Sequence, residues 1–515
     1  MRGLLSPALF CLSTLALGGI AAQAQDWRTA GFDAQRSQWM RSNGEIAPDT
    51  VKSPDFELLW KVQVKNEPRQ MSAMTPPILL ERIVGYRGFR ALGFFGTSDG
   101  HIYAVDTDLA RMEWKRRIES GPISSDATIA CPGGLTSTMA RPTRYEFPPP
   151  SFGGRGRRTA ATSAVGQPKA GAVTLQPRER PAPRSAEEPT SARVGRPLGN
   201  PNSGLSLVYA VTSDGMFHSF HTSNGATHVA PIPFLPPNAH ALGLIVIDDT
   251  AYAATVNGCG GVPDGVWALN METKEVTQWP KAGNPTASLT GLFGFAMGSD
   301  GKPHAGDKSG AISVLEPKSL GSNRPIRVLP EGVGLTTTPV VVDFNDRDYM
   351  AVGWGDGSVS ITAADIQSPA ATVKGSSPAN GLATWKDEQG TTWLLASTET
   401  SVDAYKIVES AGAPALELGW TKAIAAPLPP MIVNGVVFAA ASGEFRGSDN
   451  AAERVRRSTR ATLYALNGET GAELWNSGDA IKSFSTGAGL SAGNLNIYVS
   501  TYDGTLYAFG FPMEH

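Results

Sequence analysis

The sequence has few cysteines, few charged residues and few histidines for its length. Of 515 residues only 3 are Cys and 7 are His, and 18% are charged, with a formal net charge of −3. Globular proteins usually carry about a quarter charged residues, so this composition disfavours a dedicated nucleic-acid binder, a coiled coil and a largely disordered chain. Because so few cysteines are available, burial must hold the core together.

Long hydrophobic runs are confined to the N-terminus. Residues 1–24 combine a basic start, an apolar run from Leu4 to Ile20 and a small-x-small ending, which is typical of a cleavable signal peptide. Cys11 follows Phe10, where a lipoprotein signal needs a small residue, so we expect no lipid anchor. An uncleaved membrane anchor is the alternative, although the run is short for a bilayer-spanning helix. We predict a periplasmic or secreted protein with no transmembrane segment after the signal.

Glycine and proline are plentiful instead, with 57 and 38 residues. They lack the strict period of collagen and therefore indicate many turns between short strands. One short unit occurs eight times, with an alternating quartet such as IYAV from Ile102 or LYAF from Leu506. Without insertions, its period is about 45 residues, which is typical of repeat architectures.

Each unit is expected to form four strands. An apolar inner strand such as Thr336 to Phe344 precedes a second strand such as Tyr349 to Gly355, and a hairpin turn leads to the third. A fourth strand often ends in tryptophan, at Trp114, Trp279, Trp420 and Trp475. Four-stranded units of this period are typical of β-propeller blades. We predict an all-β fold, an eight-bladed β-propeller with four-stranded blades.

The last unit lacks an outer strand, because the chain stops at LYAFGFPMEH. The segment DFELLWKVQV, from Asp55 to Val64, precedes the first unit and contains the same tryptophan pattern. We predict that this N-terminal strand completes the C-terminal blade and closes the ring. The expected organisation is a signal peptide at 1–24, an N-terminal extension at 25–54 and the propeller at 55–515.

The hairpins, the sequence LYALNGETGAELW from Leu463 to Trp475 and the period together resemble the quinoprotein-type propeller repeat. That repeat occurs in pyrroloquinoline quinone (PQQ) dehydrogenases and in BamB-type propellers of outer-membrane assembly. The resemblance covers roughly Asp55 to the C-terminus apart from two insertions. It implies the fold, whereas function depends on the site. The second, fourth and fifth units lack the fourth-strand tryptophan, so regular tryptophan docking is not expected there.

Two insertions interrupt the repeat. Residues 141–204 are rich in Pro and contain ten Arg and one Lys against four Glu. This segment is too poor in aliphatic residues to offset its ordering entropy, so we expect a disordered surface loop. An anionic partner for this basic loop is the alternative. Residues 443–460, with Arg454, Arg456, Arg457 and Arg460, are expected to form a smaller exposed loop.

Cys131 and Cys259 are the two cysteines that follow the signal segment. An oxidising compartment favours a disulfide between them. The repeat register places Cys131 after the inner strand of the second unit and Cys259 between the middle strands of the third, on opposite faces of a propeller. Because a disulfide needs Cα atoms within about 7 Å, both a disulfide and two unpaired thiols remain open, and metal binding by the pair is not expected.

The residues that PQQ catalysis requires cannot be identified. The resemblance implies PQQ held over Ca²⁺ by carboxylate and amide oxygens, often beside an adjacent Cys-Cys pair, and the sequence contains no Cys-Cys. The metal-binding Glu and Asn and the catalytic Asp of that family match no position, and other metal or nucleophile motifs are absent. We therefore assign no catalytic residue, no metal site and no cofactor.

The remaining candidate site follows from the geometry of a propeller. Inner strands line the axial channel of a propeller, and their first residues face the funnel where propellers usually bind ligands. Asp126 and His240, from neighbouring blades, form the one titratable pair at these positions. The candidate ligand-binding residues are Asp126, His240, Asn380, Thr290 and Thr338, and the alternative is that they are ordinary solvated residues of the funnel.

These patterns favour an exported, monomeric, non-catalytic binding or assembly module in the cell envelope or outside it. Its partner would be an envelope protein or a small ligand in the axial funnel. The alternative is a PQQ-dependent oxidoreductase, with Ca²⁺, that acts on an alcohol or sugar.

Overall fold

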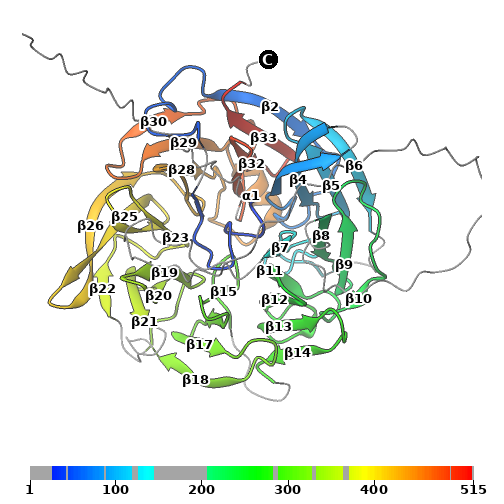
Figure 1. Cartoon of the computed structure of the whole chain (residues 1–515), viewed down its shortest axis with the longest axis horizontal. Helices are drawn as coiled ribbons and strands as arrows, with labels where there is room; N and C mark the ends of the chain where they lie inside the picture. The colour runs from blue at the N-terminus through cyan, green and yellow to red at the C-terminus, as the bar shows by residue number, and fades with distance from the viewer. Residues whose placement is uncertain are drawn as a thin grey trace, which may run out of the picture.

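The computed structural model describes residues 26–41, 44–85, 88–118, 126–143, 206–281, 288–327, 332–363, 370–487 and 489–512. The strands in these residues form eight small sheets around a central axis (Figure 1). The prediction of an all-β, eight-bladed propeller is therefore confirmed. The predicted insertion at 141–204 lies outside the described residues, except for its first three residues.

Each blade runs from an inner strand at the axis to an outer strand at the rim (Figure 1). Blade 1 contains β3 (Ile78–Gly85), β4 (Gly88–Gly96), β5 (His101–Asp106) and β6 (Arg111–Arg117). Blade 2 contains β8 (Leu207–Val211), β9 (Met216–His221) and β10 (Ile232–Pro233). Blade 3 contains β11 (His240–Ile247), β12 (Thr250–Val256), β13 (Gly265–Asn270) and β14 (Val276–Trp279). Blade 4 contains β15 (Phe295–Met297), β16 (Pro303–Gly306), β17 (Ala311–Leu315) and β18 (Ser322–Arg327).

The second half of the ring repeats this arrangement. Blade 5 contains β19 (Val340–Phe344), β20 (Arg347–Gly353), β21 (Ser358–Ala363) and β22 (Ala371–Lys374). Blade 6 contains β23 (Gly381–Lys386), β24 (Thr392–Ser397), β25 (Ser401–Ser410) and β26 (Ala413–Ala423). Blade 7 contains β27 (Met431–Val433), β28 (Val436–Ala441), β29 (Thr462–Asn467) and β30 (Glu473–Asn476). Blade 8 contains β31 (Leu490–Gly493), β32 (Asn496–Ser500), β33 (Thr505–Gly510) and β2 (Glu57–Gln63).

The outer strand of blade 8 comes from the other end of the chain, as predicted. Strand β2 pairs antiparallel with β33 from Glu57 opposite Gly510 to Gln63 opposite Thr505. In Figure 1 the blue β2 lies beside the red β33. The N-terminal strand therefore brings both ends of the chain into one sheet. This pairing closes the ring and covers the edge of β33 that would otherwise be free.

Tryptophans of the outer strands dock onto the next blade at three junctions. The indole N–H of Trp60, Trp114 and Trp420 donates to the carbonyl of Thr107 (3.1 Å), Thr222 (2.8 Å) and Gly468 (2.9 Å) respectively. Gly225, with φ +67°, lies under the ring of Trp114, and a Cβ there would be 2.6 Å from the ring. Only glycine combines this positive φ with so close an approach, which explains the Gly in these turns.

Blade 2 departs from the four-strand expectation. In place of a regular inner strand, the described residues show an isolated bridge between Ala140 and Tyr209 of β8. The chain then forms β7 (Pro142–Thr143), which pairs in parallel with β11 of blade 3. Cys131 therefore precedes the inner segment of blade 2, and the predicted register, which placed it after that segment, is wrong.

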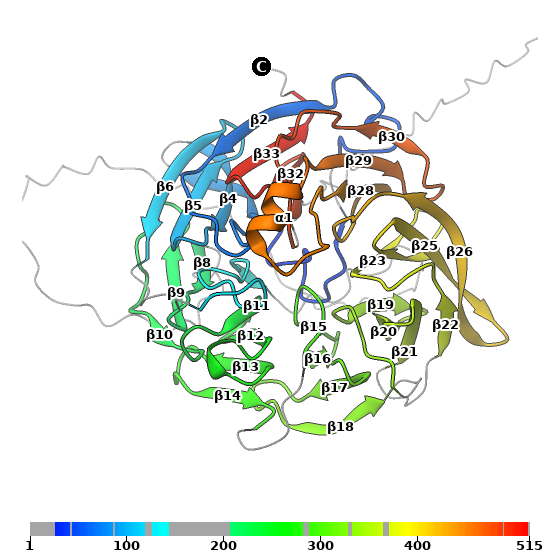
Figure 2. The same cartoon turned by 180° about the vertical axis from the view of Figure 1, so that it is seen from behind.

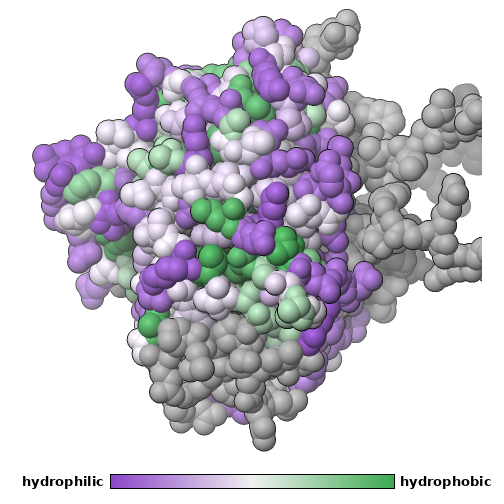
Figure 3. All heavy atoms as spheres, turned by 90° about the vertical axis from the view of Figure 1, so that its left-hand side faces the viewer, coloured by the Kyte–Doolittle hydropathy of each residue, from purple (hydrophilic) through white to green (hydrophobic). Residues whose placement is uncertain are grey.

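The side of the ring that blades 5 and 6 form is mainly polar. Seen from the side of blades 5 and 6, small green patches are scattered among purple and white residues (Figure 3). Among the described residues, the exposed large hydrophobic side chains are Leu109, Val229, Val276 and Leu418. They come from four different blades, so they do not form one continuous apolar surface.

His304 of β16 makes the stability of the ring sensitive to acid. It is buried, and no described group is hydrogen-bonded to either ring nitrogen. Burial lowers the pKa of His304 from 6.5 to about 4. As the pH falls, the unfolded chain therefore binds a proton at this histidine before the folded chain does. The folded state is fully stable above pH 6.5, the pKa of the unfolded chain, and it loses stability as the pH falls from there toward 4. We expect this one group to reduce the unfolding free energy by about 3 kcal/mol across that window.

Urea denaturation at neutral pH and at a pH near 4 measures this loss of unfolding free energy. The His304→Leu variant should show a clearly smaller pH dependence, whereas His221→Gln, which changes a half-buried histidine at the end of β9, should retain it. Identical pH dependence in wild type and His304→Leu would show that another group is responsible.

Candidate functional site

The N-terminal segment 26–40, here called the plug, lies inside the axial channel. In Figures 1 and 2 the dark blue chain runs through the centre of the ring. Backbone N–H groups of five inner strands donate to its carbonyls: Leu79 to Trp27, Met297 to Ala34, Val341 to Gln35, Thr384 to Ser37 and Ile432 to Gln38, at 2.7–3.1 Å. Its last two residues form β1 (Trp39–Met40), parallel to β27. The plug therefore contacts the inner strands of blades 1, 4, 5, 6 and 7 at once.

Arg36 is the central side chain of the plug and is completely buried. Its guanidinium donates to the Phe295 carbonyl (2.9 Å), Thr29 Oγ1 (3.1 Å), the Ala30 carbonyl (2.6 Å) and the Gly243 carbonyl (2.7 Å). Burial lowers the pKa of Arg36 to about 9, and Asp33 opposes that shift. The guanidinium is thus charged at neutral pH and links the plug to blades 3 and 4.

Two further ionisable groups hold the plug. Arg141, just before β7, is buried and forms an ion pair with Asp26 at the start of the plug. Asp33 accepts hydrogen bonds from the Ser37 backbone N–H (2.9 Å) and hydroxyl (2.6 Å). Burial raises the pKa of the Asp33 carboxyl. Arg141 is buried and ion-paired, so it does not belong to the exposed insertion predicted at 141–204.

Three of the predicted funnel residues serve contacts within and between blades. Thr290 Oγ1 donates to the Thr337 carbonyl (3.0 Å), and Thr338 Oγ1 accepts from the Phe293 N–H (3.0 Å). Asn380 accepts from the Ser397 hydroxyl (2.5 Å) and donates to the carbonyls of Thr398 (3.2 Å) and Pro427 (3.4 Å). These side chains form hydrogen bonds with the protein itself, so they connect neighbouring segments of the funnel wall.

A small cavity lies where the inner strands of blades 4 to 7 begin. Its volume is about 10 Å³, room for about one water molecule. Its lining is mainly apolar, with Leu292, Phe293, Val340, Leu382 and Pro429 beside Thr338 and Asn380. Pockets that enclose drug-sized ligands measure roughly 300–1,000 Å³, so this cavity does not accommodate a planar tricyclic quinone.

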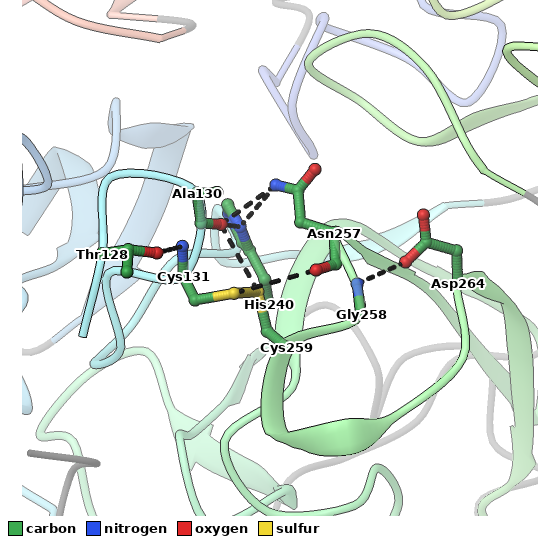
Figure 4. The surroundings of a disulfide bond; sticks show 8 residues. All are labelled: Thr128, Ala130, Cys131, His240, Asn257, Gly258, Cys259 and Asp264. Atoms are coloured by element: carbon green, nitrogen blue, oxygen red, sulfur yellow. Dashed lines mark hydrogen bonds between the residues drawn. A yellow bond between two sulfur atoms is a disulfide. The ribbon is translucent and has the colours of Figure 1, made fainter. Parts of the chain in front are cut away.

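His240, Cys131 and Cys259 meet on the opposite side of the funnel, at blades 2 and 3 (Figure 4). The two cysteines form a disulfide with a Cα–Cα distance of 5.4 Å. Pairing is feasible because Cys131 precedes the inner segment of blade 2, while Cys259 follows the second strand of blade 3. Both connections emerge on the same face of a propeller, contrary to the expectation from the sequence.

The carbonyl of Ala130 gathers the polar side chains around this disulfide. His240 Nδ1 lies 2.8 Å from it, and Asn257 Nδ2 donates to it at 3.0 Å (Figure 4). Asp126 is exposed at the start of the same segment, 126–131. The structure thus brings His240 to the segment that carries Asp126, and it adds Asn257, which sequence reasoning missed because Asn257 follows strand β12 rather than starting an inner strand.

The 443–460 insertion lies on the funnel face of blade 7. It contains α1 (Ala451–Arg457), the one α-helix among the described residues. In Figure 2 this helix stands in front of the ring, close to its axis. Glu444 joins Arg446 (3.1 Å) and Arg454 (3.3 Å). The expected exposed loop is therefore an ordered arm with internal ion pairs.

The funnel residues do not match the donor set that PQQ and Ca²⁺ would need. Ca²⁺ takes six to eight oxygen ligands, several of them carboxylates. In the part of the chain that the structure describes, no three His, Cys, Asp or Glu side chains come together in a way suited to a metal ion. Asn380, the amide candidate, is occupied by protein contacts. No reaction step through this cofactor follows from the described residues.

Comparison with known proteins identifies the fold and not the activity. No protein-family model and no curated protein sequence matches the chain. A solved quinohemoprotein alcohol dehydrogenase from Comamonas testosteroni aligns over 95% of this chain and 81% of its own, with a TM-score of 0.57 and 11% identity. A europium-containing methanol dehydrogenase aligns over 95% of this chain and 98% of its own, with a TM-score of 0.54 and 11% identity.

A third solved structure, BamB from Moraxella catarrhalis, aligns over 89% of this chain and 99% of its own, with a TM-score of 0.47 and 11% identity. The two dehydrogenase alignments, with TM-scores above 0.5, show that the chain has the fold of quinoprotein-type propellers, in agreement with the resemblance of its repeat. Identities this low establish fold alone. Among the described residues no helix has the length and hydrophobicity needed to cross a membrane.

Proposed function

We propose that this chain is a non-catalytic binding or assembly module that works in the periplasm or outside the cell. Its ligand, an envelope protein or a small molecule, enters the funnel on the face that carries His240 and α1. The observation that carries this proposal is the plug. A channel filled by backbone contacts to five blades and by the buried Arg36 offers a floor on which a ligand in the funnel can rest.

The polar groups of the funnel also favour binding over catalysis. Thr290, Thr338 and Asn380 are committed to protein contacts, while His240 and Asn257 stand at the mouth. Among the described residues, His240 does not belong to a cluster of His, Cys, Asp or Glu that could hold a metal ion. The half-buried His240 and the exposed Asn257 are suited to binding a ligand at the funnel mouth.

Addition of PQQ and Ca²⁺ to the purified protein separates this proposal from the oxidoreductase alternative. We expect no increase in melting temperature and no dye-linked oxidation of alcohols or sugars. A melting temperature that rises with PQQ concentration, together with turnover, would refute the non-catalytic function. A PQQ-dependent dehydrogenase assayed in the same buffer provides the positive control.

Site-specific photo-crosslinking in the native host tests the binding surface directly. A photoreactive residue at Asn257, which is exposed at the funnel mouth, should give a discrete adduct. The matched control is Leu418, which is 59% exposed on the outer strand β26. Adducts of equal yield at both positions, or adducts only at Leu418, would place the interaction away from the funnel.

A further inference from the structure

The segment 126–131 is fastened to blade 3 by two adjacent contacts at the funnel mouth. The first is the Cys131–Cys259 disulfide. The second is one residue earlier, where the Ala130 carbonyl accepts hydrogen bonds from His240 and Asn257 (Figure 4). The covalent bond therefore fixes the position of the carbonyl that orients both side chains.

This arrangement determines the tautomer of His240. A carbonyl oxygen can only accept, so Nδ1 at 2.8 Å must carry the hydrogen. In a neutral imidazole the other nitrogen, Nε2, is then an acceptor. Burial lowers the pKa of His240, which keeps the ring neutral at pH 7. The side chain is half-buried, and its hydrogen-bond contacts with the described residues Ala130 and Asn257 are made at Nδ1, so the Nε2 lone pair is available to a ligand.

The neighbouring groups favour a positively charged donor. Asn257 uses its amide N–H on Ala130, which leaves its Oδ1 as a second acceptor on an exposed side chain. Asp264, on the same loop, is buried and accepts from the Gly258 N–H at 2.7 Å; its negative charge acts on His240 through electrostatics and not by direct contact with a ligand. Two acceptors beside a carboxylate match an ammonium group, which has three donors and no acceptor.

We propose that the Cys131–Cys259 disulfide positions His240 as a hydrogen-bond acceptor, and that the funnel binds its ligand through an ammonium group at Nε2. The ligand part rests on the proposed function, because it assumes that the funnel is the binding site. The positioning part concerns the free protein and does not depend on any ligand.

Reduction of the disulfide releases this arrangement. A dithiol such as dithiothreitol supplies two electrons and two protons; the S–S bond breaks, two thiols form and the dithiol becomes a cyclic disulfide. The segment 126–131 then loses its covalent link to blade 3, and the hydrogen bonds at the Ala130 carbonyl compete with water at the funnel mouth. His240 is expected to sample both tautomers, so Nε2 is no longer a dedicated acceptor.

Nitrogen-15 NMR of the full mature protein labelled at histidine tests the positioning. Oxidised wild type should show a single Nδ1–H tautomer for His240. Dithiothreitol-treated wild type and the variant carrying both Cys131→Ala and Cys259→Ala should show a mixture of tautomers. The control Asn257→Ala, which leaves the disulfide in place, should retain the single tautomer. An unchanged Nδ1–H signature after reduction would overturn the positioning role, and because wild type is used, this outcome does not depend on folding of the variant.

Titration with n-butylammonium chloride, followed at the Nε2 signal, tests the ligand class. We expect saturable binding to the oxidised protein with affinity at least about tenfold weaker after reduction, a difference of about 1.4 kcal/mol. The uncharged analogue n-butanol should bind more weakly than n-butylammonium. Absence of any Nε2 response, or equal affinity for both probes, would overturn the ammonium assignment. A locked tautomer combined with no funnel adduct in the crosslinking experiment would refute the proposed function and leave the positioning role intact.

Discussion

Deletion of residues 25–63 should abolish cooperative folding of the propeller. This deletion removes both the plug and β2, so β33 becomes an exposed edge and the channel loses its contents. Phe56 is buried and packs against Trp475, Phe438 and Phe511 at ring-centroid distances of 4.9–6.0 Å. Loss of this contact weakens the junction between blade 7 and blade 8, the blade in which β2 pairs with β33 and closes the ring.

Thermal unfolding followed by near-UV circular dichroism measures the effect. We expect no sigmoidal transition for the deletion variant, together with aggregation through the free edge of β33. As a control, residues 447–457, which include α1, can be replaced by a short Gly-Ser linker; this segment carries surface ion pairs and no buried residue of the helix. A deletion variant that melts within about 2 °C of wild type would show that β2 does not close the ring.

The Arg36→Met substitution should lower the unfolding free energy by about 3–5 kcal/mol, the usual cost of breaking a buried charged network by removing one member. Methionine retains much of the apolar stem and cannot donate to the four oxygens that the guanidinium satisfies. The carbonyls of Phe295, Ala30 and Gly243 would lose their partner inside the channel. Asp33, whose pKa burial already raises, would also lose a stabilising positive charge.

Urea denaturation of Arg36→Met and of Arg28→Met isolates the contribution of burial. Arg28 belongs to the same segment, but its side chain is 33% exposed and its ion pair with Asp26 is 3.8 Å long. We expect the control to lose less than about 1 kcal/mol, because exposed ion pairs contribute little. Equal losses in both variants would mean that the plug is not held by the Arg36 contacts.

Repetition made the fold predictable from the sequence. Quartets such as the one beginning at Leu506 alternate with a period of two, and the Asp-Gly turns between strands leave little choice of hairpin. The closing strand was predictable as well, because one outer strand was missing at the C-terminus and one spare strand preceded the first unit. The strand and turn signals are local to each blade, whereas the closing strand follows from counting strands over all eight units.

The site was less predictable because it depends on register between distant segments. The described part of blade 2 shows an isolated bridge at Ala140 in place of a regular inner strand, so repeat register misplaced Cys131 relative to the axis and set it on the wrong face. Asn380 is a predicted ligand-binding residue, yet its amide N–H groups donate to the carbonyls of Thr398 and Pro427. Whether a polar side chain at the start of an inner strand faces a ligand or the neighbouring blade depends on packing.

The sequence by itself determined the all-β class, the eight blades and the closing strand, because strand periodicity and turn chemistry are encoded within each repeat. Tertiary structure decided that residues 26–40 fill the channel, that Arg36 is buried there and that Cys131 reaches Cys259. The plug carries no repeat pattern, and its hydrogen bonds go to strands up to about 400 residues away, so its conformation is defined only once the ring exists.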